Sequence, residues 1–270
     1  MSPRLRGAER IVLLLDYDGT LRPIARRPQD AGAGPRLLGL LRRLEKIRGL
    51  TSVIVTGRTI TSIRGLLPLR NTWFVGVHGA EICRGFGKSR WLVDTGETRT
   101  AIRHVVRALR PHMDSGYTLE DKRVAVSMHY RLAPPESIQR MCALFRRLGA
   151  PHVEKGLFKF NSGKGVIETI PAKAHKGLAV DAFCLKQSRR KIFCMAFGDD
   201  ETDEDLFRSV KSRGIAVAVG RRPSRAEHRF HDPADVCRFL NLLGRAWIKS
   251  SKISGRRDDQ DTMEEVLIRA

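Results

Sequence analysis

A run of five apolar residues that leads into two closely spaced aspartates constrains the fold most. Residues 11–15 read Ile-Val-Leu-Leu-Leu, and Asp16 and Asp18 follow them. A short apolar run without polar alternation is typical of a strand that is buried on both faces, as in parallel sheets. The carboxyl ends of such strands are where α/β proteins bind their ligands. We therefore expect a parallel sheet with two carboxylates at its ligand-binding edge.

Strand and helix patterns alternate along much of the chain. The other predicted core strands are residues 52–55, 74–77, 191–197 and 215–219. The predicted helices between them are residues 36–48, 176–185 and 201–210. Alternation of this kind implies right-handed crossovers and a parallel sheet. The fold class is therefore α/β, with a doubly wound and mostly parallel sheet.

The middle of the chain has a different pattern. Its predicted elements are helices at 101–109 and 136–148, extended chain at 117–130, and a hairpin of 152–160 with 166–170 around the turn 162–165. These elements predict a small α+β cap at 99–170. The cap would be inserted between two parts of the core, 1–98 and 171–248. The polar residues 249–270 are expected to form a flexible tail.

Composition excludes several classes of protein. The 270 residues include 50 Lys and Arg against 29 Asp and Glu, a formal net charge of +21. This surplus either attracts anions or reflects Arg dispersed over helix surfaces. The hydrophobic content of 41% excludes wholesale disorder. We expect no membrane span and no secretory leader. Five cysteines without a CxxC pair predict reduced thiols and a cytoplasmic protein.

A second group of acids interrupts this basic chain. Residues 199–205 read Asp-Asp-Glu-Thr-Asp-Glu-Asp and follow a predicted strand. If the strands are neighbours, Asp199, Asp200 and Asp203 converge with Asp16. Such carboxylates repel each other without a cation, and oxygen ligands favour magnesium. Otherwise the acids form a solvated helix start that the helix dipole stabilises.

Two further segments have the groups that bind a phosphate dianion. Thr56-Gly57-Arg58 follows the predicted strand 52–55, and Lys176 opens a predicted helix. A hydroxyl, backbone N–H groups and an ammonium suit phosphate oxygens. Each segment is common alone. Together with the acid pair and the acid cluster, in this order along the chain, they form a strong signal.

These four segments resemble the four motifs of the haloacid dehalogenase superfamily of phosphotransferases. The resemblance extends to the trehalose-6-phosphate phosphatase family and covers most of the chain, from about residue 11 to about residue 243. The segments that match are 16–21 with 23–24, 77–81, 119–122, 129–131, 163–164 with Glu168, 176–177 and 198–204. Thr56 stands where the family usually has Ser, and it keeps the hydroxyl.

The resemblance implies a role for each matching residue of the core. Asp16 would attack phosphorus and form an aspartyl-phosphate. Asp18 would protonate the leaving sugar oxygen and then activate water, which favours phosphoryl transfer over dehalogenation. Thr56 and Lys176 would hold the phosphate oxygens. The implied magnesium ligands are Asp16, the backbone carbonyl of Asp18, Asp199, and Asp200 or Asp203 through water.

The cap residues that match the family would recognise the sugar. The resemblance implies that Glu120, Lys122 and Glu168 hold its hydroxyl groups, and that Lys164 lies nearby. Glu120 and Lys122 could instead pair with neighbours on an exposed strand face. The other candidate substrate contacts are Thr20, Gly57, Arg58 and His78. His129 and Arg131 are expected to be structural.

The implied reaction is magnesium-dependent hydrolysis of trehalose 6-phosphate to trehalose and phosphate, in trehalose biosynthesis. A phosphatase for another sugar phosphate, such as a sucrose or glycosylglycerate phosphate, is the first alternative. A phosphomutase and a basic nucleic-acid-binding module are the others. The expected partner is a small phosphosugar, with a trehalose-6-phosphate synthase as pathway neighbour. We expect neither a membrane nor a nucleic-acid partner.

Overall fold

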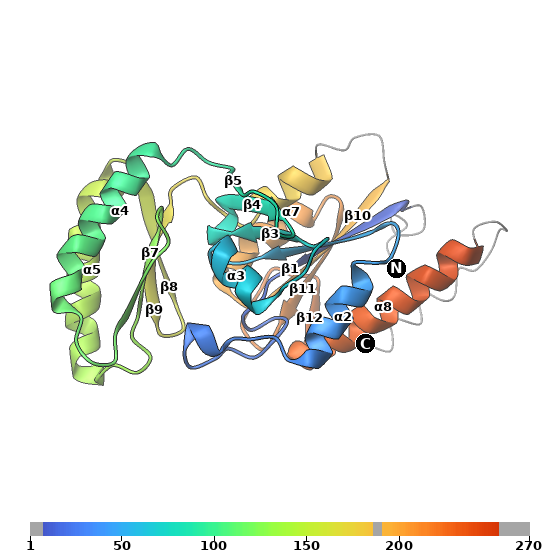
Figure 1. The fold of residues 1–270 in the computed structure, drawn as a ribbon, viewed down its shortest axis with the longest axis horizontal. Coiled ribbons are helices and arrows are strands. Elements are labelled where there is room, and N and C mark those ends of the chain that lie inside the picture. The colour runs from blue at the N-terminus through green and yellow to red at the C-terminus, as the bar shows by residue number, and fades with distance from the viewer. Residues whose placement is uncertain (1–7, 186–190, 254–270) are drawn as a thin grey trace.

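An eight-stranded sheet with helices on both faces forms the larger part of the computed structural model (Figure 1), which describes residues 8–185 and 191–253. The strand order is β12-β11-β10-β1-β2-β3-β4-β5. The strands are β1 (Arg10–Leu15), β2 (Leu50–Val55), β3 (Trp73–Gly76), β4 (Glu81–Arg84), β5 (Arg90–Trp91), β10 (Ile192–Gly198), β11 (Gly214–Val219) and β12 (His228–Phe230). All pairings from β12 to β3 are parallel, and β4 and β5 are antiparallel. The predicted doubly wound, mostly parallel α/β fold is confirmed.

Two helical layers bury the faces of this sheet. One layer contains α2 (Pro35–Leu44), α3 (Ile60–Leu66) and α8 (Pro233–Ile253). The other contains α6 (Leu178–Val180), its π-helical continuation η4 (Asp181–Leu185) and α7 (Glu204–Val210). In β1, Leu13 packs under the first layer and Leu14 under the second. Full burial of such a side chain contributes about 1.5–3 kcal/mol. The apolar run 11–15 is therefore buried on both faces, as predicted.

A smaller α+β unit lies beside the core. Its antiparallel sheet has the order β6-β7-β9-β8. The strands are β6 (Thr118–Asp121), β7 (Val126–His129), β8 (Phe158–Gly163) and β9 (Val166–Pro171), and the helices are α4 (Gly96–Leu109), η3 (Arg110–His112) and α5 (Pro135–Glu154). Figure 1 shows α4 and α5 on the side away from the core, so the open face of the sheet is turned toward the core. This unit is called the cap below.

Inside the cap, three predicted boundaries are wrong. The extended segment 117–130 is two strands, because Arg123 adopts a left-handed φ of 70° and reverses the chain. Helix α5 continues through Pro151 to Glu154, so β8 begins at Phe158 and not at residue 152. The turn of the second hairpin is only Lys164 and Gly165, since Gly163 still pairs with Val166. The periodicity of short segments did not fix these ends.

At the other end of the chain, α8 runs to Ile253. The prediction of a flexible tail from residue 249 is therefore wrong for residues 249–253, because the helix continues there. The rest of the predicted tail, residues 254–270, lies outside the described residues. Among the helices of residues 8–185 and 191–253, none combines the length and the apolar content that crossing a bilayer needs.

The cysteines differ from the prediction in one respect. Cys83, Cys142 and Cys237 are free thiols, as expected. Cys194, which is buried in β10, is disulfide-bonded, so the prediction of reduced thiols is wrong there. Spacing in the sequence does not reveal which thiols the fold brings together. The side chain of Cys184 lies outside the described residues.

Candidate active site

Three neighbouring strands deliver the predicted chemical groups to one edge of the core sheet. Strand β1 pairs in parallel with both β10 and β2. Asp16 follows β1, Asp199 follows β10 and Thr56 follows β2. Parallel neighbours end at the same edge, so these residues meet although up to 183 positions separate them.

A compact carboxylate cluster lies at this edge. Oxygen atoms of Asp16, Asp199 and Asp203 all lie within 4.8 Å of one another. The buried Nζ of Lys176 donates to Oδ1 of Asp16 and to Oδ1 of Asp203, each at 2.8 Å. Oδ2 of Asp16 and Oδ1 of Asp199 are buried without a hydrogen-bond partner. Unpartnered carboxylate oxygens are costly to bury, so this set of hard oxygen donors fits a divalent cation.

The electrostatics of the cluster agree with this fit. Burial raises the pKa of Asp16 to about 7, although the charge of Lys176 opposes the shift. Burial and then the charge of Asp16 raise the pKa of Asp199 to about 6. Burial also raises the pKa of Asp203. Without a cation these carboxyls tend to retain protons, which a bound metal ion would displace.

The loops around the cluster are shaped to hold it. Gly19 has a φ of +94°, and a Cβ there would lie 2.3 Å from the Asp199 carboxylate. Asp200 caps the short helix η5 (Glu201–Asp203) by accepting from the N–H of Thr202 at 2.9 Å. In turn, the carboxylate of Asp203 accepts a hydrogen bond from the N–H of Asp200 at 3.1 Å. This reciprocal cap fixes the Asp203 carboxylate beside Lys176.

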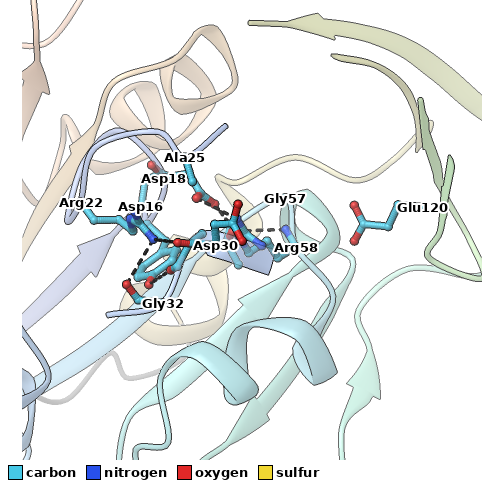
Figure 2. A network of polar contacts seen from close by, with 12 residues as sticks. Asp16, Asp18, Arg22, Ala25, Asp30, Gly32, Gly57, Arg58 and Glu120 are labelled. Carbon is cyan, nitrogen blue, oxygen red and sulfur yellow. Dashed lines mark hydrogen bonds and ion pairs between the residues drawn. The ribbon is translucent and has the colours of Figure 1, made fainter. Parts of the chain in front are cut away.

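Asp18 lies beside the cluster and is held by Arg58 (Figure 2). The guanidinium donates from Nε to Oδ2 at 2.6 Å and from Nη2 to Oδ1 at 2.9 Å. The backbone N–H of Arg58 donates to Oγ1 of Thr56 at 3.2 Å. Arg58, a predicted substrate contact, forms a two-point ion pair with Asp18 in this structure. Long-range pairing of this kind leaves no pattern in the sequence.

The cap contributes a row of polar residues. Glu120 on β6 pairs in register with Ser127 on β7, Ser127 pairs with Glu168 on β9, and Glu168 pairs with Asn161 on β8. Side chains alternate along a strand, and Val126 packs under the cap helices. The polar row therefore occupies the open face of the cap sheet, toward the core.

Glu168 is the most heavily bonded member of this row. Its carboxylate accepts from Ser127 Oγ at 2.9 Å, Asn161 Nδ2 at 2.9 Å and Lys122 Nζ at 3.1 Å, and it contacts His78 Nε2 at 2.8 Å. Burial alone would raise its pKa, but His78 and Lys122 outweigh burial and hold the pKa well below its usual range. Glu168 is therefore ionised and locked in place.

Lys122 and Glu120 extend this network from the cap toward the core. Nζ of Lys122 donates to the carbonyl of Gly57 in the core at 2.9 Å. Glu120 lies 3.9 Å from the same Nζ and 3.2 Å from His129 Nε2. Burial raises the pKa of Glu120, but the hydrogen bond of His129 and the charge of Lys122 lower it overall. Figure 2 shows that Glu120 reaches from the cap toward the Arg58 loop.

A cavity of about 170 Å³ lies between the core and the cap. The predicted site residues that line it are Asp16, Asp18, Thr56, Gly57, Arg58, His78, Glu120, Lys122, Lys164, Glu168, Lys176, Asp199 and Asp200. Exposed Lys164 also places its Nζ 3.3 Å from Asp199. Thr20 does not line the cavity, because its side chain is fully buried. Asp203 lies behind the cavity and contributes to the carboxylate cluster.

Sequence reasoning missed several lining residues, among them the polar Ser127 and Asn161, and left His129 and Arg131 as structural. Alternation offered a signal for Ser127, since it lies between apolar Val126 and Met128. For Asn161 the missing signal was the hairpin turn. If this turn had been predicted as Lys164 and Gly165 alone, the register would have placed Asn161 opposite Glu168. The cavity also shows that His129 and Arg131 face the site.

This core, with paired aspartates after β1 and a lysine among further carboxylates, shares its fold with a solved haloacid dehalogenase-like hydrolase of B. subtilis, which superposes with a TM-score of 0.56 at 15% identity. Residues 14–233 match the family model described as trehalose-phosphatase. The chain therefore belongs to the trehalose-phosphatase family.

The description of one similar protein agrees with this assignment, and that of another differs. The chain is 33% identical over 213 residues to a probable trehalose-phosphate phosphatase of Sinorhizobium fredii, with 77% of each chain covered. It is 30% identical over 260 residues to a protein of Mycobacterium tuberculosis described as an uncharacterized glycosyl hydrolase. That alignment covers 89% of this chain but only 19% of the mycobacterial protein, so the chain spans about a fifth of that relative's length.

A solved structure has the same fold. The crystal structure of a trehalose-6-phosphate phosphatase related protein superposes with a TM-score of 0.77 at 23% identity. The match covers 88% of this chain and 99% of the other. At this identity the likeness establishes the fold of the core and cap together.

Proposed function

We propose that this chain hydrolyses trehalose 6-phosphate to trehalose and phosphate through an aspartyl-phosphate intermediate, as a phosphoric monoester hydrolase of trehalose biosynthesis. One observation carries the proposal. Unpartnered oxygens of Asp16 and Asp199 lie beside the Lys176 ammonium, at the end of a cavity that the polar row of the cap closes. The carboxylates and Lys176 can hold a phosphoryl group, and the polar row of the cap offers hydrogen bonds to a sugar.

In the first step, the carboxylate of Asp16 forms a bond to phosphorus while the bond from phosphorus to the sugar oxygen breaks. Asp18 gives its proton to that oxygen, and trehalose leaves. Arg58 engages both oxygens of Asp18, so one contact must open for this transfer. Thr56 and Lys176 hold the oxygens of the phosphoryl group.

In the second step, water attacks the phosphorus of the aspartyl-phosphate. Asp18 takes the proton of this water, the acyl bond to phosphorus breaks, and Asp16 regains its carboxylate. Phosphate then leaves the cavity. The same two aspartates therefore serve both halves of the reaction, and no net change remains in the protein.

Magnesium is the cofactor that we propose for this site. The residues that would hold it are Asp16, Asp199 and Asp203, with Asp200 and the carbonyl of Asp18. The buried oxygens without partners support this assignment. When bound, the ion offsets the negative charge that develops on the transferring phosphoryl group. Binding also satisfies oxygens that the protein leaves unpaired.

The sugar contacts form the next part of the proposal. Glu120, Lys122 and Glu168 read the sugar hydroxyl groups, with Lys164 at the mouth of the cavity. The loop residues Gly57, Arg58 and His78 face the phosphoryl end, and Thr20 supports this end from within the core. We also propose 1–98 with 171–248 as the catalytic core and 99–170 as the cap. The cap excludes water from the closed site.

The cellular setting follows from the substrate. Trehalose 6-phosphate is the product of a synthase, so a trehalose-6-phosphate synthase is the proposed pathway neighbour of this chain. We place the reaction in the cytoplasm, where sugar phosphates are made. A phosphosugar is then the partner that the cavity takes up.

A panel of phosphosugars tests the proposed function. Phosphate release is measured from trehalose 6-phosphate, sucrose 6-phosphate, glucosylglycerate phosphate and p-nitrophenyl phosphate, with magnesium and with chelator. We expect the largest kcat/KM for trehalose 6-phosphate and loss of release with chelator. The variant Asp16→Asn should lose turnover while keeping its fold, because the amide is a poor nucleophile. Asp114→Asn, at an exposed position of the cap, is the matched control.

Two results would overturn the proposal. A higher kcat/KM for another sugar phosphate would reassign the substrate, and turnover in Asp16→Asn would remove the acyl-phosphate mechanism.

A further inference from the structure

We propose that His78 is a positioning residue that couples closure of the cap to the loop that binds phosphate. The inference rests on the proposed function, because it takes residues 56–58 as that loop. His78 lies in the turn η2 (Val77–Gly79), which joins β3 to β4. Three features of this turn point to the role: its backbone strain, its bonds to the loop and its contacts with the cap.

The backbone of the turn is strained. Val77 has a φ of 48° and His78 a φ of 54°, both in the left-handed region. A β-branched residue such as valine rarely adopts this conformation. Strain of this kind persists only where the surroundings enforce it, and it clusters at functional sites. The fold therefore holds these two side chains in directions that an ordinary turn would not give.

The turn is bonded directly to the phosphate loop. The N–H of Val77 donates to the carbonyl of Arg58 at 2.8 Å, and the N–H of His78 donates to the carbonyl of Thr56 at 3.0 Å. A Cβ on Gly57 would lie 2.4 Å from Nε2 of His78. The absence of a side chain at Gly57 thus makes room for the imidazole. Turn and loop form one packed unit.

The same turn contacts the cap with both side chains. Val77 belongs to a buried apolar cluster with Val124 and Ala125 of the cap. Nε2 of His78 lies 2.8 Å from Oε1 of Glu168, and both side chains are buried. The phosphate loop also contacts the cap directly, because Lys122 Nζ donates to the carbonyl of Gly57. Lys122 and Glu168 are themselves paired, at 3.1 Å.

These contacts form a continuous path. It runs from Thr56 and Arg58 through the strained turn to Glu168, and from Glu168 into the polar row of the cap. An anion that orders the loop therefore also orders His78, and His78 holds the cap closed through Glu168. The reverse follows from linkage, since closure of the cap favours anion binding by the same factor.

Two substitutions separate the imidazole from the backbone strain. Asparagine tolerates the left-handed region, so His78→Asn keeps the turn, but its side chain is too short to reach Glu168. Glutamine places an amide nitrogen close to the position of Nε2, so His78→Gln keeps the contact. His104→Asn, at an exposed position of α4, is the matched control.

Hydrogen exchange measures the coupling without any sugar substrate. Exchange is followed in the loop segment 54–60 and in the cap segments 118–129 and 158–171, before and after addition of magnesium with beryllium fluoride. In the unchanged protein we expect slower exchange in all three segments. In His78→Asn the loop should still respond, and the response of the cap should fall about tenfold, the effect of one hydrogen bond to a charged group. His78→Gln should restore it.

Glu168→Gln provides the partner measurement. If the path runs through this contact, the double variant His78→Asn with Glu168→Gln should lose no more cap response than either single variant. Additive losses would contradict the path. The proposal is overturned if the cap of His78→Asn responds like the unchanged protein, if His78→Gln responds like His78→Asn, or if the anion leaves the cap unchanged.

The hydrogen-exchange results do not depend on which sugar phosphate the protein hydrolyses. A failure to hydrolyse trehalose 6-phosphate would overturn the proposed function and leave the exchange result intact. For turnover, His78→Asn should lower kcat/KM for sugar phosphates about tenfold, because the closed cap is weakened, and His78→Gln should restore most of it. A kcat/KM of His78→Asn equal to that of the unchanged protein would contradict a role in closure.

Discussion

Single residues set the geometry of the carboxylate cluster, and Gly19 shows how narrow the choice is. Its φ of +94° and the 2.3 Å from its missing Cβ to Asp199 exclude any larger residue without movement. Glycine thus serves two purposes here, since it permits the turn after Asp18 and leaves the Asp199 carboxylate its position. The two purposes can be tested separately, because Gly220 also has a positive φ but no close neighbour at its missing Cβ.

We predict that Gly19→Ala and Gly220→Ala each lose about 1–2 kcal/mol of stability, the cost of a left-handed alanine. Gly220 has a φ of +84° and open space around it. Only Gly19→Ala should also weaken magnesium binding, because its methyl group displaces Asp199. Calorimetry gives both quantities. Equal magnesium affinity in the two variants would show that Asp199 is not held by this contact.

The raised pKa values of the cluster predict a pH dependence of stability. Burial raises the pKa of Asp16 to about 7 and of Asp199 to about 6, above the ordinary 3.8. Between about pH 4 and about pH 7 the folded protein holds protons that the unfolded chain has released, so stability falls as pH rises through this window. Magnesium replaces these protons, so its stabilising effect should grow over the same window.

Melting temperatures with chelator and with magnesium measure this effect. The magnesium-induced rise in Tm should be larger at about pH 8 than at about pH 5, and Asp16→Asn should reduce the difference. A rise in Tm that is the same at both pH values would contradict the assignment of the cluster as the metal site.

The sequence predicted this cluster well for a physical reason. Asp16, Asp199 and Thr56 directly follow buried parallel strands, so the topology fixes where they meet. The pairing of Arg58 with Asp18 and the burial of Thr20 could not be predicted in the same way. Both depend on side-chain directions in loops, which have no periodicity.

At the scale of elements, the cap sheet separates packing from recognition by strand alternation. Apolar residues such as Val126 and Ile167 face α4 and α5, and the row from Glu120 to Asn161 faces the cavity. One face thus provides stability and the other provides chemistry. A change on the open face should therefore alter substrate preference with little effect on the folding of the cap.

We predict that Glu120→Gln raises KM for trehalose 6-phosphate about tenfold, the effect of weakening a charged hydrogen bond. The aryl substrate p-nitrophenyl phosphate has no sugar, so its kcat/KM should change less than about twofold. Glu136→Gln, at an exposed position of α5, serves as the control. Parallel losses on both substrates would mean that Glu120 acts on the core and does not read the sugar.

Prediction of the elements succeeded where burial dominates. The five residues of 11–15 identify β1, because each side chain is buried. Prediction failed in the cap, where α5 continues past Pro151 to Glu154 and Val153 still packs on the cap interior. It also merged β6 and β7, since the reversal at Arg123 depends on one left-handed residue and not on glycine.

At the scale of the whole molecule, the net charge of +21 would attract the proposed substrate, because its phosphate is a dianion at neutral pH. Charge of one sign raises the encounter rate with ligands of the other sign, and salt screens this attraction. We predict that kcat/KM for trehalose 6-phosphate falls about two- to tenfold between low and high ionic strength. Inhibition by neutral trehalose should stay constant. A kcat/KM that does not depend on salt would show that the surplus charge has no part in substrate capture.

The central claim is that Asp16 carries the phosphoryl group during turnover. Borohydride added during steady-state hydrolysis reduces an aspartyl-phosphate to an alcohol, which leaves homoserine in place of aspartate. Mass spectrometry of the peptide that contains Asp16 then reads the site directly. We predict homoserine at position 16 only when substrate and magnesium are both present. Turnover that proceeds with unmodified Asp16, or with the modification at another residue, would contradict the account.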